Sequence, residues 1–109
     1  PGAELPWSNV NKDKDLFVIE TFRDSDHRNI MMCYGLGWKG TYAAGKYFDT
    51  AIYPNIGLYP YSWIIVKWED TNGDYFVNGP NDGDTYTVIL EILHLFHLVF
   101  ISLIITLQL

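Results

Sequence analysis

The residues best suited to chemistry lie in one acidic stretch between Asp70 and Asp82. Their spacing lets a tightly wound loop turn carboxylate, amide and carbonyl oxygens toward one point. The candidate ligands are the side chains of Asp70, Asn72, Asp74, Asn78 and Asp82 and the main-chain carbonyl of Phe76. A hard divalent cation prefers such oxygens, and calcium accepts six to eight of them. The stretch therefore predicts a calcium site, with calcium as the expected cofactor.

The same stretch resembles the calcium loops of dockerins and EF-hands. The positions that match the pattern of these loops are Asp70, Asn72, Asp74, Val77 and Asn78. The chain departs from that pattern at Tyr75, where the loops have Gly, and at Asn81, where they have an acid. The flanking sequences also predict strands rather than helices. The resemblance therefore implies a calcium loop in a β-context, not a cohesin-binding module.

A plain hairpin turn is the alternative for this stretch. Asn72-Gly73 between two apolar runs is the strongest short signal for a two-residue type I′ turn, which needs no metal. The carboxylates would then only keep the turn hydrated. The sequence leaves both interpretations open.

Other reactive side chains give weaker signals. Glu91, His94 and His97 are spaced so that a helix would place them on a face about 120° wide, where they could hold zinc or copper between chains. Alternatively, these three polar groups are satisfied by partners in an assembly or lie near a membrane interface. Cys33 is the only cysteine and lies in an apolar run, which favours a buried small hydrophobe. The chain has no G-x-S-x-G or H-E-x-x-H motif, and we expect no enzyme activity.

Aromatic residues make up 17% of the chain. Tyr53, Tyr59 and Tyr61 lie in or beside a Pro-rich stretch, where their rings could stack on sugars. Packing in the core is the favoured alternative for most of these rings, because large aromatic side chains are generally buried.

The elements that must position these residues are short strands separated by turns. The predicted strands are Leu16–Arg23, Asn29–Gly37, Trp38–Asp49, Tyr61–Asp70, a short Tyr75–Asn78 that pairs back on it, and Thr85–Leu90. We expect a long surface loop over Thr50–Pro60 and no helix before the C-terminal segment. Strands at roughly ten-residue spacing favour a mainly β fold, a small β-sandwich or barrel-like domain.

The predicted domain organisation has three parts: an extended N-terminal arm over residues 1–15, a β-rich domain over 16–87 and a hydrophobic segment over 88–109. As a helix the last segment would extend about 33 Å, which is enough to cross a bilayer. A strand is the alternative, because the segment continues Thr85–Leu90 without a break.

The hydrophobic segment is expected to pack against protein. Glu91, His94 and His97 would be costly in hydrocarbon, and no basic residue flanks the segment as a membrane anchor would require. A core element of the domain itself is a further alternative. The expected assembly contacts are Leu90, Leu93, Leu95, Phe96, Leu98, Phe100, Ile101, Leu103 and Ile104.

These features predict an extracellular or cell-surface structural protein that assembles into a filament or layer. The design resembles type IV pilins and archaeal flagellins, which join an apolar helix to a β-rich domain, but in reversed order. The expected partner is the chain itself, as a homo-oligomer or polymer. A membrane-anchored surface domain and a carbohydrate-binding β-module are the alternatives. The net charge of −6 argues against a nucleic-acid partner.

Overall fold

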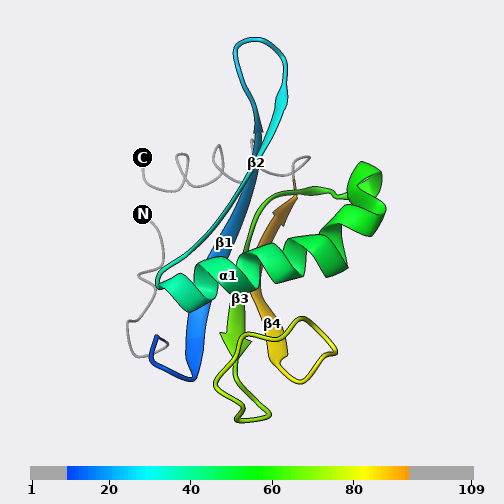
Figure 1. The fold of residues 1–109 in the computed structure, drawn as a ribbon. Helices are drawn as coiled ribbons and strands as arrows, with labels where there is room; N and C mark the ends of the chain where they lie inside the picture. Colours follow the sequence, from blue (N-terminus) through cyan, green and yellow to red (C-terminus); the bar gives the residue numbers. More distant parts are fainter. Residues whose placement is uncertain (1–9, 94–109) are drawn as a thin grey trace, which may run out of the picture.

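The structure is a computed structural model that describes residues 10–93; segments 1–9 and 94–109 lie outside the described residues. Its centre is a four-stranded antiparallel sheet with the order β2-β1-β3-β4 (Figure 1). The strands are β1 (Lys14–Arg23), β2 (Asn29–Gly35), β3 (Tyr61–Glu69) and β4 (Thr85–Leu93). The predicted mainly β class is confirmed. Residues 10–93 form a single sheet, so they do not by themselves complete a sandwich or barrel.

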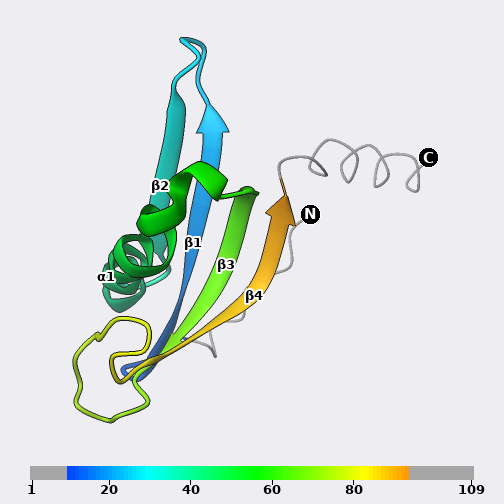
Figure 2. The same cartoon turned by 90° about the vertical axis from the view of Figure 1, so that its right-hand side faces the viewer.

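A helical layer covers one face of this sheet (Figure 2). It comprises α1 (Trp38–Tyr47), a π-helical turn (Phe48–Ile52) and a 3₁₀ helix (Tyr53–Leu58). The buried core lies between the two layers. Its members are Phe17, Ile19, Ala43, Ala44, Ile52, Ile64, Val66, Trp68 and Val77.

The prediction of a strand over Trp38–Asp49 is wrong, because this segment forms α1. The small residues Gly40, Ala43 and Ala44 recur at helical spacing and are buried against the sheet, whereas Trp38 and Tyr42 are exposed. Packing of that small-residue face outweighs the strand preference of the aromatic residues. The expected loop over Thr50–Pro60 is also helical over most of its length.

Asp15, at the start of β1, fixes the beginning of α1. Its buried carboxylate accepts hydrogen bonds from the main-chain N–H groups of Gly37 at 3.1 Å and Gly40 at 2.7 Å. A carboxylate also suits the positive end of the helix dipole. Gly40 is required for this contact, because a Cβ there would lie 2.6 Å from the Leu16 carbonyl oxygen and 2.7 Å from the Asp15 carboxyl carbon.

The β1–β2 hairpin extends beyond the rest of the sheet (Figure 1). The last β1–β3 pair joins Glu20 to Trp63, but β1 and β2 continue to pair up to Arg23 and Asn29. We call residues 21–31 the hairpin arm. Its tip is closed by an ion pair of 2.9 Å between Arg28 Nε and Asp24 Oδ2.

β4 forms one edge of the sheet and contains residues 88–93 of the predicted hydrophobic segment as strand. Of the expected assembly residues, Leu90 and Leu93 lie in β4, and the other seven lie outside the described residues. A bulge at Ile89 interrupts the pairing with β3. Within residues 10–93, no helix has the length and apolarity needed to cross a bilayer.

Candidate cation site between β3 and β4

Residues 70–84 form one irregular loop that joins β3 to β4 (Figure 1). The alternative of a two-residue hairpin at Asn72-Gly73 is wrong, because β3 ends at Glu69 and β4 begins only at Thr85. The expected pairing strand over Tyr75–Asn78 is likewise irregular. The loop is long enough to bring side chains from its two ends together.

The C-terminal end of the loop is fixed by three hydrogen bonds. The Trp68 indole N–H donates to Oδ2 of Asp84 at 2.8 Å, and the Asn78 N–H donates to the same oxygen at 2.7 Å. The Tyr86 hydroxyl donates to the Asn78 carbonyl at 2.6 Å. Both Trp68 and Tyr86 belong to the sheet, so the core positions the loop.

The N-terminal end of the loop turns sharply at Gly73 and Tyr75. Both residues have left-handed backbone angles, with φ of 70° and 69°. Tyr75 is the position at which the resembled calcium loops have Gly. Here its N–H donates to Oδ2 of Asp70 at 2.9 Å, which supports the turn without a glycine.

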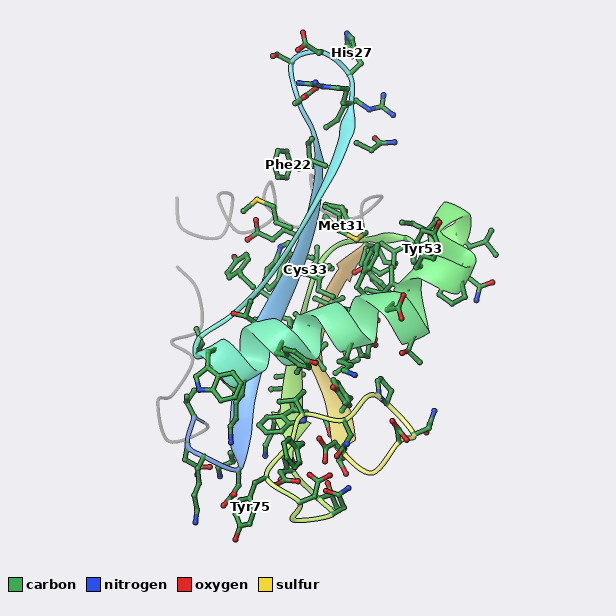
Figure 3. The ribbon with its side chains drawn as sticks, in the orientation of Figure 1. Phe22, His27, Met31, Cys33, Tyr53 and Tyr75 are labelled. Atoms are coloured by element: carbon green, nitrogen blue, oxygen red, sulfur yellow. The ribbon has the colours of Figure 1, made fainter. Side chains whose placement is uncertain are left out.

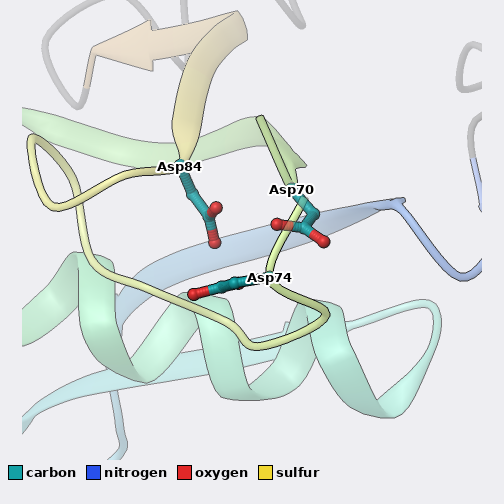
Figure 4. A group of neighbouring side chains, drawn as sticks. All are labelled: Asp70, Asp74 and Asp84. Carbon is teal, nitrogen blue, oxygen red and sulfur yellow. The ribbon is translucent and has the colours of Figure 1, made fainter. Parts of the chain in front are cut away.

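This loop gathers the carboxylates of Asp70, Asp74 and Asp84 (Figure 4). One oxygen from each lies within 4.8 Å of the other two. Calcium binds oxygens at about 2.3–2.6 Å, so oxygens around one ion lie within about 5 Å of one another. The separation of the three carboxylates therefore allows one metal ion to contact all three.

Two of these carboxylates have buried atoms, and neither is paired with a basic side chain among residues 10–93. Asp84 is only 7% exposed. Oδ1 of Asp70 is a buried atom that accepts no hydrogen bond from any described residue. None of the ion pairs found within residues 10–93 involves the three aspartates. The cluster thus brings three carboxylates together with no basic side chain paired to them among residues 10–93, an arrangement that a bound cation would stabilise.

The titration of Asp84 reflects this arrangement. Burial raises the pKa of its carboxyl group, and the charges of Asp70 and Asp74 raise it further. The hydrogen bonds from Asn78 and Trp68 act in the opposite direction. A cation among the three groups would favour their charged forms.

The other predicted ligands occupy different places. Oδ1 of Asn72 accepts from the Asp74 N–H at 3.2 Å, and the N–H of Phe76 donates to Asp74 at 2.9 Å. The amide of Asn78 faces the Asp74 carboxylate, and the orientation that places its nitrogen on that side gives 3.0 Å between the nitrogen and Oδ2. Asp82 is exposed and is not part of the cluster.

Asp84, which sequence reasoning did not include among the ligands, takes the place expected for Asp82. The sequence did not reveal the register between β3 and β4, and this register places Asp84. Trp68 pairs with Tyr86, so the residue two positions before Tyr86 lies where the indole of Trp68 can reach it.

The expected sugar-stacking tyrosines do not form a common flat surface. The rings of Tyr59 and Tyr61 meet edge to face, with 5.4 Å between centroids and 78° between planes. The hydroxyl of Tyr59 is buried, and burial raises its pKa. Tyr53 packs on Phe48 instead, in the helical layer (Figure 3).

The other side chains that the sequence suggested as reactive are Glu91, His94, His97 and Cys33. A hydrogen bond from Tyr61 to Glu91 raises the pKa of the Tyr61 hydroxyl. His94 and His97, the other members of that predicted metal set, lie outside the described residues. Cys33 is half-buried on β2, and burial raises the pKa of its thiol, which favours the unreactive protonated form.

No protein-family model matches the chain, and neither a curated protein nor a solved structure matches it. Evidence about function therefore comes from the residues of the chain and their geometry.

Proposed function

We propose that this chain is a structural subunit, extracellular or at the cell surface, that self-assembles through β4 and the hydrophobic segment that follows it. The observation that carries the proposal is that β4 is an apolar edge strand leading directly into residues 94–109. Val88, Ile89 and Leu90 are 40%, 49% and 39% exposed. β4 contains neither Lys nor Pro, and the features of this strand that act against edge pairing are the bulge at Ile89 and the charge of Glu91.

The sequence of residues 94–109 supports the same function. This stretch has no Asp, Glu, Lys or Arg, and it also lacks Gly, Pro and Asn. Gly, Pro, Asn, Asp and Ser are the residues that most often reverse the chain, and of these the stretch has only Ser102. A long apolar segment with one weak turn former is poorly suited to fold back on its own domain, so another copy of the protein is the better partner.

Removal of the segment tests the proposal. The truncation should follow Leu93, because an earlier end would delete part of β4. In buffer without detergent, we expect ordered polymers of the full chain by negative-stain microscopy and monomers of the truncated chain by sedimentation velocity. Polymers formed equally by both chains would refute the proposal.

The same two chains separate the alternatives. Flotation of only the full chain with lipid vesicles, without polymers, would instead indicate a membrane anchor. Glycan binding retained by the truncated chain would indicate a carbohydrate-binding module.

A second proposal concerns the loop over residues 70–84, which binds calcium and thereby stabilises the subunit. The buried, unpartnered Oδ1 of Asp70 beside the carboxylates of Asp74 and Asp84 supports it. A ligand at about 100 times its Kd would stabilise the fold by roughly 2.7 kcal/mol. For a domain of this size we expect Tm to rise by several degrees.

Calcium titration of thermal unfolding tests the second proposal. Asp70→Asn and Asp84→Asn should abolish the rise in Tm, whereas Asp82→Asn, in the same loop but outside the cluster, should preserve it. A Tm of the unaltered protein that is the same in EDTA and in millimolar calcium would count against calcium binding.

A further inference from the structure

β1 and β3 bury side chains on both faces of the sheet. We call the face away from the helical layer the outer face. Phe17 and Val66 pair with each other and belong to the core beneath the helical layer. Because side chains alternate along a strand, their neighbours Leu16, Val18 and Ile65 lie on the outer face. These three are 0%, 9% and 7% exposed and form a second buried group, separate from that core.

No helix or loop of residues 10–93 lies over this second group. The helical layer and the loop over residues 70–84 both lie on the opposite side of the sheet (Figure 2). Leu16 is the most informative member, because it lies near the end of the sheet: it pairs with Lys67 on β3, and β2 pairs with β1 only from Phe17 onward. Neighbours within the sheet do not remove such a side chain from water. Its complete burial points to cover by a segment outside residues 10–93.

The chain before β1 is directed toward Leu16. It reverses at Lys12 and Asp13, where the Asn11 N–H donates to the Lys14 carbonyl at 2.8 Å in an antiparallel bridge. The residues before Asn11 therefore run back along β1. They cannot remain in the plane of the sheet, because the N–H of Leu36 donates to the Leu16 carbonyl on that side.

The outer face is the open path for these residues. On the helical side, the first turn of α1 is hydrogen-bonded to Asp15 and occupies the space beside the start of β1. Residues 1–9 must therefore pass the end of β1 on the side where Leu16 is buried.

The sequence of residues 1–9 suits an apolar cover. Leu5 and Trp7 are two residues apart, and an extended chain places such side chains on one side. Pro6 between them favours an extended conformation at Leu5. At about 3.3 Å per residue, Trp7 would lie about 10 Å from Val10, and Leu16 to Val18 spans about 7 Å. Both apolar side chains can therefore reach the buried group.

From these observations we infer that residues 1–9 lie across the outer face of their own copy, with Leu5 and Trp7 over Leu16, Val18 and Ile65. The inference goes beyond the proposed self-assembly and does not depend on it. Such a cover would protect the middle of an apolar sheet face from non-specific association with other proteins.

Residues 1–9 are favoured over residues 94–109 as the cover because of where each segment joins the sheet. Residues 94–109 follow Leu93, which pairs with Tyr61. Leu16 pairs with Lys67, six residues further along β3, or about 20 Å away. Residues 1–9 join the chain at the end of the sheet where Leu16 lies.

Photo-cross-linking tests the inference directly. Benzoylphenylalanine, which keeps an aromatic ring, is placed at position 7 of full-length protein of natural isotope content, and this protein is mixed with full-length ¹⁵N-labelled protein and irradiated. We expect links to Leu16, Val18 or Ile65 within one isotope form. The same probe at position 42, on the exposed side of α1, should give none to these residues. Links from position 7 only to residues 38–58, only to the other isotope form, or to no residue would overturn the inference.

A pair of double-mutant cycles provides the second measurement, on the full chain at a concentration below assembly. Trp7→Ala should lower Tm by several degrees. Combined with Val18→Ala, the loss should be smaller than the sum of the two single losses, because the two side chains share a contact. Combined with Ile19→Val, on the helical side of the same strand, the losses should add. Additive losses in both pairs, or no loss from Trp7→Ala, would contradict the inferred contact.

Discussion

The indole of Trp68 donates a hydrogen bond of 2.8 Å to the carboxylate of Asp84, and both side chains are buried. Through this bond a core residue of β3 holds the end of the loop that carries the acidic cluster. The same oxygen of Asp84 also accepts from the main chain of Asn78. The position of Asp84 is therefore set by the core, whether or not a cation is bound.

Trp68→Phe should show how much this bond contributes. The substitution leaves a buried carboxylate with one donor fewer, and we expect the free energy of unfolding to fall by about 1–3 kcal/mol. Urea denaturation measures the change. Trp38→Phe is the control, because Trp38 is exposed and its replacement should have an effect within about 0.5 kcal/mol. Equal losses in both variants would contradict the assigned role of the bond.

The raised pKa of Asp84 predicts how stability depends on pH without calcium. The folded state binds this proton more tightly than the unfolded state, so stability should increase as pH falls toward the unfolded value near 3.8. As pH rises through the folded pKa, this contribution is lost. Urea denaturation in EDTA at several pH values measures it, and Asp84→Asn should reduce the dependence while Asp82→Asn should not. An unchanged profile for Asp84→Asn would contradict this assignment.

Two glycines of α1 should respond in opposite directions to alanine. Gly40→Ala would force a Cβ to within 2.6 Å of the Leu16 carbonyl oxygen, and a loss of about 2 kcal/mol or more is expected from such crowding. A Cβ at Gly45 would meet no neighbouring element within 4 Å, so Gly45→Ala should stabilise by up to about 1 kcal/mol. Thermal unfolding compares the two. Stabilisation by both would mean that α1 does not approach β1 so closely.

Ile89→Lys tests the contribution of the β4 edge to assembly. A lysine on this exposed edge should hinder pairing with another strand and raise the assembly concentration by about tenfold. Met32→Lys, on the opposite edge strand β2 and similarly exposed, is the matched control and should have little effect. Light scattering over a concentration series gives both values. A stronger effect of Met32→Lys would place the contact at β2 instead.

The strands could be predicted from sequence where their apolar residues are concentrated. The segment expected over Leu16–Arg23 lies within β1, which begins two residues earlier, and the segment expected over Tyr61–Asp70 is β3 to within one residue. The segment expected as a strand over Trp38–Asp49 forms α1, because its helical face consists of Gly40, Ala43 and Ala44. Gly and Ala contribute little to a hydrophobic pattern in the sequence. Their burial depends on the sheet that packs against them, which the local sequence does not reveal.

The acidic cluster could be predicted only in part. The spacing of Asp70 and Asp74 predicts that they converge, because spacing within one loop is a local property. The position of the Asp84 carboxylate depends on where Trp68 lies in the sheet. That is a tertiary relationship, which spacing along the chain does not reveal. Asp82 has the same chemistry and a closer position in sequence, but it is exposed.

The contacts of Asp15 link two elements that are distant in sequence. Its carboxylate accepts from the amides of Leu16, Gly37 and Gly40, so the start of β1 and the first turn of α1 share one buried acceptor. Opening either element would leave this charge unsatisfied. The amide protons of Gly37 and Gly40 should therefore exchange with deuterium only when β1 itself opens, which makes the two elements one cooperative unit.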